Sequence, residues 1–532
     1  MRASWRRCME RGRTEAERLL GNIMNKSLDI IFGLIETANK KLVWALAAML
    51  LFTGCALTPH YQPPVVQTPP AFKELPPKPA TVPDSVQINE GGAWKTADPR
   101  DNVIRGKWWE VFQEPEVNSL EEQATVFNQS VAGALANFLA ARAVVKQVRS
   151  QYFPLVTAGP SVTRARQSSV LTQSGSSPGA FTRTEYSLPF DASWEVDLWG
   201  RVRNSVKASS YEAQATLGDF ESVRLTVQAE VAADYFQLRL LDEQKRLLDA
   251  AVLADGESVQ LTRTQLDTGL ASGQDIDLSV TQLDLARAQA TDIGILRAQL
   301  EHAIAMLLGK LPSAFSIAPT ALAAKTITIP TGVPSQLLER RPDIAAAERR
   351  VAEANAQIGV ARAAYFPTIT LGASAGSGST SLGSLLSGPS LVWAVGSTLA
   401  QTLFDGGKRK AVNAQAQAIY QGTVANYRQT VLAAFQEVED GLSTLRVLSQ
   451  ELQEQNAAVE SSQHYLALTN DRYKAGLDDY LTSLAAQTAL LTNQRTVTNL
   501  RMQQMTASVQ LVKALGGGWD ASKLPSPRDL QH

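Results

Sequence analysis

Hydrophobic residues recur at every seventh position through about 50 residues in the second half of the chain. The run starts at Val424 and ends at Tyr473, and a second seam includes Phe435 and Leu442. Between the two ends of the first seam, the seventh positions hold Val431, Val438, Leu445, Leu452, Val459 and Leu466. A seven-residue repeat sustained over this length predicts a long helix that supercoils in the left-handed sense against neighbouring helices.

A weaker ladder of the same period lies in the first half, where Arg224 and Lys245 interrupt it. Its apolar members are Leu217, Val231, Leu238, Val252, Val259 and Leu266. It predicts a helix from about Val202 to Leu266, which would be roughly 95 Å long at 1.5 Å per residue. No compact domain needs a helix of that length.

Alternation of apolar and polar residues predicts β-strands. Between residues 185 and 198 the apolar positions include Tyr186, Phe190 and Trp194, and every second residue is polar or proline. Period-two patterning over about 13 residues matches a tilted membrane strand with one face toward lipid and one toward water. Similar alternation covers residues 369–375 and 391–403. We therefore expect two strands in each half of the chain.

Three pairs of landmarks indicate an internal duplication. Tyr152-Phe153-Pro154 recurs at residues 365–367 with an offset of 213, whereas Gly269-Leu270 and Leu308-Gly309 recur with an offset of 207. Each unit is predicted to contain a helix, a strand pair, a very long helix, a tight turn and a returning helix. In the first unit the opening helix should run from residue 131 to 151 and stop before Pro154. The predicted units are residues 101–325 and 326–520, followed by a C-terminal tail at 521–532.

Four strands are too few to close a transmembrane barrel, because the known single-chain minimum is about eight and an open edge is not tolerated in lipid. The chain is therefore expected to oligomerise. Two copies would supply eight strands and three would supply twelve, and the pattern alone does not choose between them. The alternative is a small soluble sheet.

The N-terminal region has the features of a bacterial lipoprotein leader. Lys40-Lys41 precede the apolar segment Leu42 to Phe52, which is too short to span a bilayer. The following Leu51-Phe52-Thr53-Gly54-Cys55 resembles a lipobox, and Ala56 fits the pattern exported to the outer membrane. We predict an N-terminal extension and signal peptide at 1–54, with lipidation at Cys55. The alternative is an ordinary signal peptide followed by a buried cysteine.

Residues 55–100 are predicted to hold the lipidated cysteine and an extended tether. The prolines that favour an extended chain are Pro59, Pro63, Pro64, Pro69, Pro70, Pro76, Pro77, Pro79 and Pro83. Such a tether would connect the membrane anchor to the folded body.

Composition excludes several other classes of protein. The 532 residues carry a formal net charge of −1, so nothing favours a nucleic-acid partner, and two cysteines at 8 and 55 exclude a disulfide framework. Gly372-Ala373-Ser374-Ala375-Gly376 matches a hydrolase elbow, but Ser374 lies in a strand pattern without a following helix. Gly406-Gly407-Lys408 lacks the spacing of a phosphate loop and is typical of a strand-to-helix turn. We expect no catalytic residue, metal or cofactor.

A dense set of motifs lies between Trp108 and Trp519. It consists of Trp108-Trp109 with Phe112 and Pro115, Leu337-Leu338-Glu339-Arg340-Arg341-Pro342-Asp343-Ile344, Ala347-Glu348, Ala354-Asn355-Ala356, Ile358-Gly359, Ala361-Arg362, Tyr365-Phe366-Pro367 and Ala514-Leu515-Gly516-Gly517-Gly518-Trp519. These motifs resemble the hallmark of NodT-type outer-membrane lipoproteins, the TolC-like exit ducts of tripartite efflux systems. The resemblance implies a mainly α fold with a transmembrane β-barrel portion. It also implies a homotrimer with a twelve-stranded barrel and a twelve-helix periplasmic tunnel.

The same resemblance places a gate at the periplasmic tip, where the long and returning helices meet. Asp275 stands where TolC-like proteins carry a tip aspartate, and Tyr473 matches a tyrosine of closed-state contacts. Thr482 and Ala485 occupy positions of aspartates in TolC, so Asp478 and Asp479 are the candidates for acidic charge in the second turn. The complete candidate set is Asp275, Asp277, Gly269, Tyr473, Gly476, Asp478 and Asp479. Gly269 and Gly476 fit left-handed turn positions, and the alternative role of Asp275 is a helix cap.

The sequence therefore predicts a passive outer-membrane exit duct for drugs or other small molecules. The resemblance implies that it docks to a periplasmic membrane-fusion adaptor and an RND-type transporter in the inner membrane. Its surroundings would be outer-membrane lipid. The alternative hypothesis is a lipid-anchored periplasmic coiled-coil scaffold without a pore.

Overall fold

A computed structural model describes most of the chain. The described residues are 59–66, 68–69, 71–74, 107–167, 181–320, 340–519, 524–526 and 529–531. The chain divides into two units, and all the elements below belong to the larger one, residues 58–197 and 201–532. The predicted signal peptide, Cys55 and the prolines from Pro76 to Pro83 lie outside the described residues.

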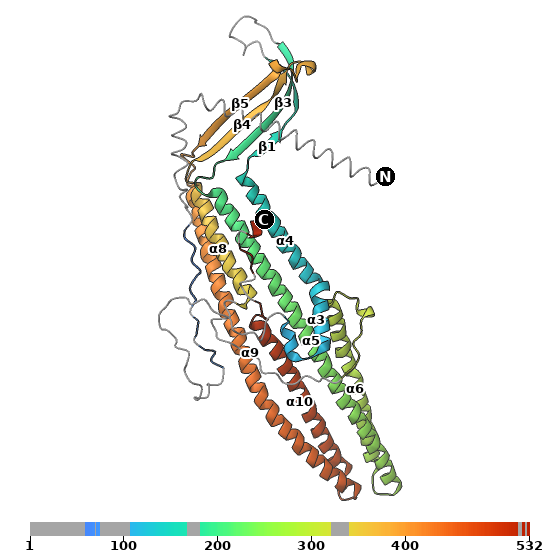
Figure 1. Ribbon diagram of the computed structural model, residues 1–532. Helices are drawn as coiled ribbons and strands as arrows, with labels where there is room; N and C mark the ends of the chain where they lie inside the picture. Colours follow the sequence, from blue (N-terminus) through green and yellow to red (C-terminus); the bar gives the residue numbers. More distant parts are fainter. Residues whose placement is uncertain are drawn as a thin grey trace. The chain divides into compact units, whose positions relative to one another are not determined.

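Long helices of equal length occur twice. Helices α5 (Arg201–Asp267) and α9 (Lys408–Lys474) each have 67 residues, and α6 (Gly273–Leu307) and α10 (Tyr480–Ala514) each have 35. Both pairs are separated by the offset of 207 that the landmarks indicated. Helix α5 extends one residue beyond the predicted range at each end. Figure 1 shows α5 with α6 and α9 with α10 as two helical hairpins.

Shorter helices open each unit. Helix α4 (Gln129–Arg149) begins where the Asn128 side chain accepts a hydrogen bond from the Val131 amide at 3.0 Å, and the short helix η2 (Ser150–Tyr152) follows it. The counterpart α8 (Pro342–Ala363) begins with proline, which costs no helical hydrogen bond at that position. Both helices end immediately before the Tyr-Phe-Pro landmark and its strands, as predicted.

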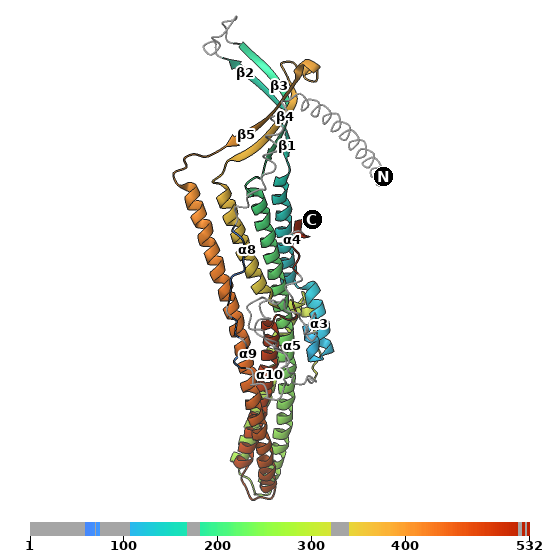
Figure 2. The same cartoon turned by 60° about the vertical axis from the view of Figure 1, so that its left-hand side comes forward.

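Helices α3 and η1 form a collar on α5. Helix α3 (Pro115–Phe127) and the short helix η1 (Trp108–Phe112) lie beside the middle of α5 (Figure 2). Trp108 is 1% exposed and stacks edge to face on Phe112, within the largest apolar cluster of the described residues. The tryptophan pair is therefore part of the core.

Five strands form one antiparallel sheet. They are β1 (Leu155–Ala158), β2 (Ser161–Gln167), β3 (Phe181–Glu195), β4 (Thr368–Ser379) and β5 (Leu391–Ala400). The order is β1-β3-β4-β5, and β2 also pairs with β3. Ala158 pairs with Phe190 and Ser161 with Ser187, so β1 and β2 follow a single register and act as one strand. Pro160 interrupts this strand because it has no amide proton to donate.

Two strands end earlier than the alternation predicted. Strand β3 stops at Glu195 rather than at Leu198, because the Asp197 carboxylate accepts hydrogen bonds from the amides of Val202 and Arg203 and starts α5. Strand β5 stops at Ala400 rather than at Leu403. The chain then turns at Gly406 and Gly407, both with positive φ, directly into α9. The predicted strand-to-helix turn is confirmed.

The sheet has no core of its own. None of the described residues of the five strands is buried, and Val395 is 76% exposed. The large apolar side chains left uncovered on β5 are Leu391, Val392, Trp393, Val395 and Leu399. Among the described strands, β1 and β5 each have a partner on one side only. Both the faces and the edges of the sheet therefore require an environment that this single chain does not provide.

The heptad seam of α9 is confirmed. Val424, Val431 and Val438 are buried, and so is Tyr473 at the lower end. The members between them, Leu445, Leu452, Val459 and Leu466, are half-buried. Helix α9 packs along this seam against α8 and α10, while α5 packs against α4, α6, α8 and α10. The seven-residue period therefore reports real side-by-side packing of helices.

Helix α4 leaves an apolar face uncovered. Together with η2 it is long and apolar enough to cross a membrane by composition, but only 11% of that stretch is buried. Leu135, Leu139 and Val144 are exposed on it. This uncovered face is available for contact with another chain.

Gly516, just after α10, should be intolerant of a side chain. Its φ is +93°, and an added Cβ would lie 2.0 Å from the Arg340 carbonyl oxygen. We expect Gly516→Ala to cost about 3 kcal/mol or more of folding free energy, measured by chemical denaturation. The matched control is Gly422→Ala at an exposed position inside α9, where an added Cβ would meet nothing within 4 Å. That change should be neutral or stabilising by up to about 1 kcal/mol, and equal losses in the two variants would contradict the prediction.

Candidate functional site

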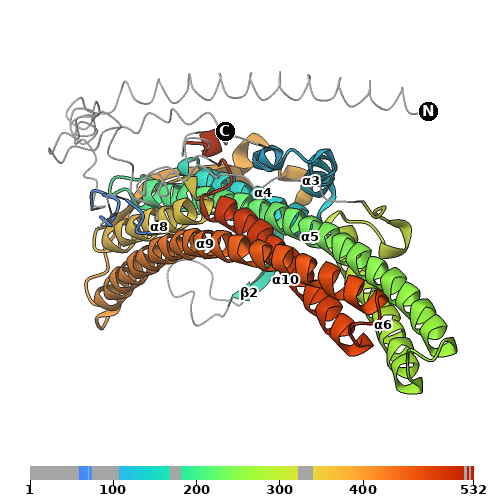
Figure 3. The ribbon, with the colours of Figure 1, turned by 90° about the horizontal axis from the view of Figure 1, so that it is seen from below.

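The two helical hairpins end in turns that lie side by side (Figure 3). Gly269 has φ of +77° and Gly476 has φ of +72°, and an added Cβ would meet nothing within 4 Å at either position. Backbone conformation, rather than space, therefore requires glycine. An equivalent backbone hydrogen bond closes each turn. The Leu270 amide donates to the Gln265 carbonyl at 2.7 Å, and the Leu477 amide donates to the Arg472 carbonyl at 2.9 Å.

Asp275 has a structural role at the first turn. Its carboxylate accepts hydrogen bonds from the amide and the hydroxyl of Ser272, both at 2.8 Å, and its own amide donates to the Ser272 hydroxyl at 3.3 Å. This reciprocal pair is a capping box at the start of α6. Asp277 is exposed, and its carboxylate has no hydrogen-bond or ion-pair partner among the described residues.

The acidic residues of the second turn are also engaged. The Arg472 guanidinium donates two hydrogen bonds to Asp478, at 2.7 and 2.9 Å, and holds the pKa of that carboxyl below its usual value. Asp479 caps α10 by accepting from the Thr482 amide at 2.9 Å and from its hydroxyl. These bonds lower the pKa of Asp479. The charge of Asp478 is thus compensated, while Asp479 carries its charge at a helix N-terminus.

Tyr473 joins the two hairpins. Its buried hydroxyl lies 3.0 Å from the Thr262 hydroxyl on α5, and the Gln265 side chain donates to its carbonyl oxygen at 3.4 Å. Burial raises the pKa of Tyr473, with a further contribution from the charge of Asp275. Its ring centroid lies 5.9 Å from that of Tyr480 at the start of α10. The end of α9 is therefore fixed to α5.

A second polar link above the tip was not predicted. Asp255 on α5 is 1% exposed and accepts a hydrogen bond from the Gln487 side chain on α10 at 2.7 Å. Burial raises the pKa of Asp255, although the bond from Gln487 opposes this shift. The nearby Tyr480 hydroxyl is buried and has no hydrogen-bond partner within the described part of the chain, and burial with the charge of Asp255 raises its pKa to about 12. The sequence did contain a signal for this buried contact, because Asp255 lies between Val252 and Val259 of the apolar seven-residue ladder.

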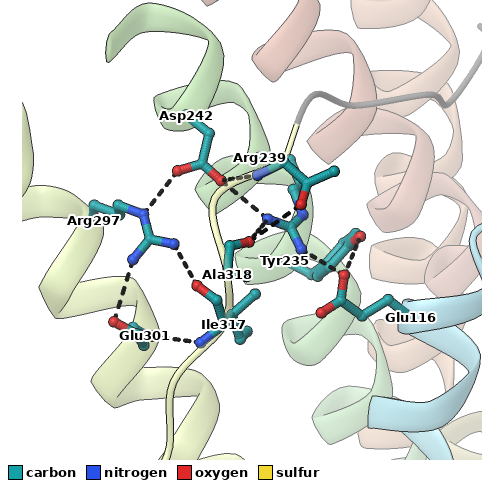
Figure 4. Close-up of polar contacts among 9 residues, drawn as sticks. Glu116, Tyr235, Arg239, Asp242, Arg297, Glu301, Ile317 and Ala318 are labelled. Carbon is teal, nitrogen blue, oxygen red and sulfur yellow. Dashed lines mark hydrogen bonds and ion pairs between the residues drawn. The ribbon is translucent and has the colours of Figure 1, made fainter. Parts of the chain in front are cut away.

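The linker clasp is a third polar cluster, at the collar. We use this name for Arg239, Asp242, Arg297 and Glu301, which hold the extended segment after α6 (Figure 4). Arg239 is 2% exposed and donates to the Ala318 carbonyl at 2.7 Å, to Asp242 at 3.0 Å and to Glu116 on α3. It thereby joins α5, α3 and the segment in one place.

Arg297 completes the clasp from α6. It donates to Asp242 at 2.7 Å and to the Ile317 carbonyl at 2.6 Å, and it pairs with Glu301 at 3.3 Å. Glu301 in turn accepts from the Ile317 amide. The buried charges are balanced by these contacts, so removal of one partner would leave an uncompensated charge. Sequence reasoning missed this cluster because its two helical pairs, Arg239 with Asp242 on α5 and Arg297 with Glu301 on α6, lie more than 50 residues apart in the sequence.

The described residues hold no cluster of metal-ligating side chains. Among them, no group of three or more His, Cys, Asp or Glu could hold a metal ion. Ser374 lies inside β4 opposite Asp191, and the strand continues to Ser379 instead of turning into a helix after the serine. The functional geometry is instead that of a wall: a sheet with both faces uncovered, continued by paired long helices. These elements match the arrangement that the resemblance to TolC-like outer-membrane channels implies.

Comparisons with known proteins agree with this class. The sequence profile of the outer membrane efflux protein family matches residues 120–310 and 333–517. A probable efflux pump outer membrane protein of Pseudomonas putida, TtgC, is 32% identical over 484 residues, which cover 90% of this chain and 96% of that protein. The chain belongs to the outer membrane efflux protein family.

Solved structures give the same result. The outer-membrane channel OprN matches with a TM-score of 0.77 and 28% identity, covering 87% of this chain and 100% of that one. The open state of the Neisseria gonorrhoeae channel MtrE matches with a TM-score of 0.73 and 26% identity, covering 88% and 99%. The protein is thus an outer-membrane efflux channel that extends into the periplasm, and the scaffold without a pore is not favoured.

Asp255 should make stability depend on pH. Its pKa is higher in the folded than in the unfolded state, so its contribution favours folding at low pH and is lost as pH rises through the folded value. We expect Asp255→Asn to match the parent protein in acid. At pH about 8 it should melt roughly 1–2 °C higher, measured by circular dichroism. The control is Asp292→Asn on the exposed face of α6, and the prediction is wrong if both variants respond alike.

Proposed function

We propose that three copies of this chain form the exit duct of a tripartite efflux pump. The observation that carries the proposal is the open sheet with uncovered faces and single-sided edge strands. In lipid, unpaired backbone groups at such edges are not tolerated, so the sheet must close with other copies. Because β1 and β2 act as one strand, each chain supplies four, and three chains supply twelve.

Three copies are favoured over two by the resemblance to the NodT-type lipoproteins. In a trimer, α4, α5, α8 and α9 of each chain would supply the twelve-helix wall of a periplasmic tunnel. The exposed apolar side chains of α4, Leu135, Leu139 and Val144, would then pack against a neighbouring copy. This assembly accounts for apolar surface that is too extensive for a monomer in water.

Transport through this duct is passive. The chain would supply only the wall of the duct, so energy and choice of cargo come from an RND-type transporter in the inner membrane. A periplasmic membrane-fusion adaptor connects the two, and the cargo consists of drugs or other small molecules. Opening is a population shift that adaptor docking favours.

The tip residues form the gate. Gly269 and Gly476 shape the turns, Asp275, Asp277, Asp478 and Asp479 set their charge and caps, and Tyr473 holds the hairpins together. Opening requires the α9–α10 hairpin to move away from α5, which breaks the contact between Tyr473 and Thr262. This buried hydrogen bond stabilises the closed arrangement by about 1 kcal/mol.

Removal of the Tyr473 hydroxyl should open the channel. We expect Tyr473→Phe to raise the open probability of purified protein in planar bilayers about fivefold, the factor that about 1 kcal/mol gives. The control is Tyr465→Phe, which removes an exposed hydroxyl on the same helix that has no partner among the described residues. Equal open probabilities would remove Tyr473 from the gate, and absence of any conductance would contradict the duct itself.

The lipid anchor at Cys55 is supported by the reach of the chain. The Pro59 carbonyl accepts a hydrogen bond from the Asn355 side chain on α8 at 3.0 Å. Four residues span at most about 14 Å, and Asn355 lies about 12 Å from the end of α8 at Ala363. A lipid on Cys55 could therefore reach the level at which the strands begin. The proposed divisions remain 1–54, 55–100, 101–325, 326–520 and 521–532.

Lipidation can be tested directly. In cells grown with labelled palmitate, the protein should incorporate label, and Cys55→Ala should lose it completely while remaining unprocessed. Cys8→Ala is the matched control, because Cys8 lies in the segment that we expect to be removed. Label retained by the Cys55 variant, or a mature N-terminus before Cys55, would contradict the anchor.

A further inference from the structure

The internal repeat assigns an equivalent position to each member of the linker clasp. Because α5 corresponds to α9 and α6 to α10 at an offset of 207, Arg239 corresponds to Arg446. Both arginines lie on the long helix of their repeat, and both bind a segment outside that helix. Arg239 holds Ala318, whereas Arg446 donates to the carboxylate of Glu74 at 2.6 Å.

The ion pair of the clasp has a neutral equivalent. Asp242 and Arg297 correspond to Ser449 and Gln504. Gln504 donates to the Ser449 hydroxyl at 3.2 Å, so the link between long and returning helix persists with no charge. The second repeat therefore keeps the arginine on the long helix and the link to the returning helix, but its arginine binds the segment that contains Glu74.

The segment that should occupy the second clasp by symmetry lies elsewhere. The chain leaves α6 and α10 through the same kind of turn, with positive φ at Gly309 and Gly516. Residues 524–527 then correspond to 317–320. However, the Pro525 carbonyl accepts from Gln214 on α5 at 2.6 Å, and Leu530 packs with residues of α4 and α5. The C-terminal segment is therefore diverted from α9.

The N-terminal segment takes the position left open. Glu439 on α9 accepts hydrogen bonds from the amides of Lys73 at 2.8 Å and Glu74 at 3.1 Å. Arg446 lies seven residues further along, on the same face of the helix, and pairs with the Glu74 side chain. Phe72 is 3% exposed and belongs to the main apolar cluster. In Figure 1 this stretch is the blue trace beside α9.

We propose that Glu439 and Arg446 on α9 form a strap clasp, an intramolecular docking site for residues 71–74. On the second repeat these residues take the place that the linker after α6 has on the first. Phe72 supplies the apolar contact, and Glu439 and Arg446 fix its register on α9. A second attachment lies upstream, where Asn355 on α8 binds the Pro59 carbonyl. The proline-rich stretch between them is held at both ends and ties α8 to α9.

The rate of proteolytic cleavage after Phe72 measures how firmly the strap clasp holds residues 71–74. Chymotrypsin cuts after phenylalanine, and the buried Phe72 should be protected in the folded full-length protein. Arg446→Glu places a negative charge against Glu74 and should accelerate cleavage between Phe72 and Lys73 about threefold to fivefold, read by N-terminal sequencing. The double variant with Glu74→Arg restores opposite charges and should return to the parent rate.

Controls separate the clasp from general unfolding. Arg428→Glu makes the same charge change on an exposed part of α9 without an ion pair among the described residues, and it should cleave at the parent rate. Glu439→Gln, which keeps the side-chain size, should also accelerate cleavage while the far-ultraviolet circular dichroism stays unchanged. Equal rates for Arg446→Glu and Arg428→Glu, or failure of the charge swap to restore protection, would overturn the proposal. Conductance does not enter this readout, so the result is independent of the proposed duct.

Discussion

The constraint on which the structure depends is that a β-sheet without a core cannot remain alone. Each strand exposes apolar side chains such as Val395 and Trp393, and the sheet ends in strands that are paired on one side. In a bilayer the side chains are accommodated, but the free backbone groups of the edges are not. In the proposed trimer, closure with other copies would satisfy those groups and would bring the long helices that follow the strands into contact. The proposed periplasmic wall would then be a consequence of barrel closure.

The long helices α5 and α9 run from the sheet to the tip and pack against neighbouring helices along the way. Strand β3 passes into α5 through the cap at Asp197, and β5 passes into α9 through Gly406 and Gly407, so each long helix starts at the sheet. From there, the seam on α9 keeps its apolar face toward neighbours over its whole length. Polar contacts occur where segments must be fixed: at the collar through Arg239, and near the tip through Asp255 and Tyr473. Apolar packing thus sets the direction of the long helices, and the polar contacts fix the segments that attach to them.

The sequence predicted what depends on periodicity and left out what depends on contacts between distant residues. Seven-residue and two-residue patterns are local, so the long helices, the strands and the turns at Gly269 and Gly476 could be located. The pairing of Asp478 with Arg472 was not expected, and it changes the charge of that turn. The linker clasp and the contact of Asp255 with Gln487 could not be found, because their partners meet only after the helices pack. Lipidation at Cys55 stays a prediction, since that residue lies outside the described part of the chain.

The equal lengths of the paired helices restrict how this chain can change during evolution. Deletion of one residue from α9 would raise its turn by about 1.5 Å and rotate it by about 100°, so Tyr473 would no longer face Thr262. A length change in one hairpin therefore requires a matching change in the other. The region of the sheet has no such restriction. The landmark offset falls from 213 to 207 between Pro154 and the start of α5, so the six-residue difference between the repeats lies among the strands and their connections.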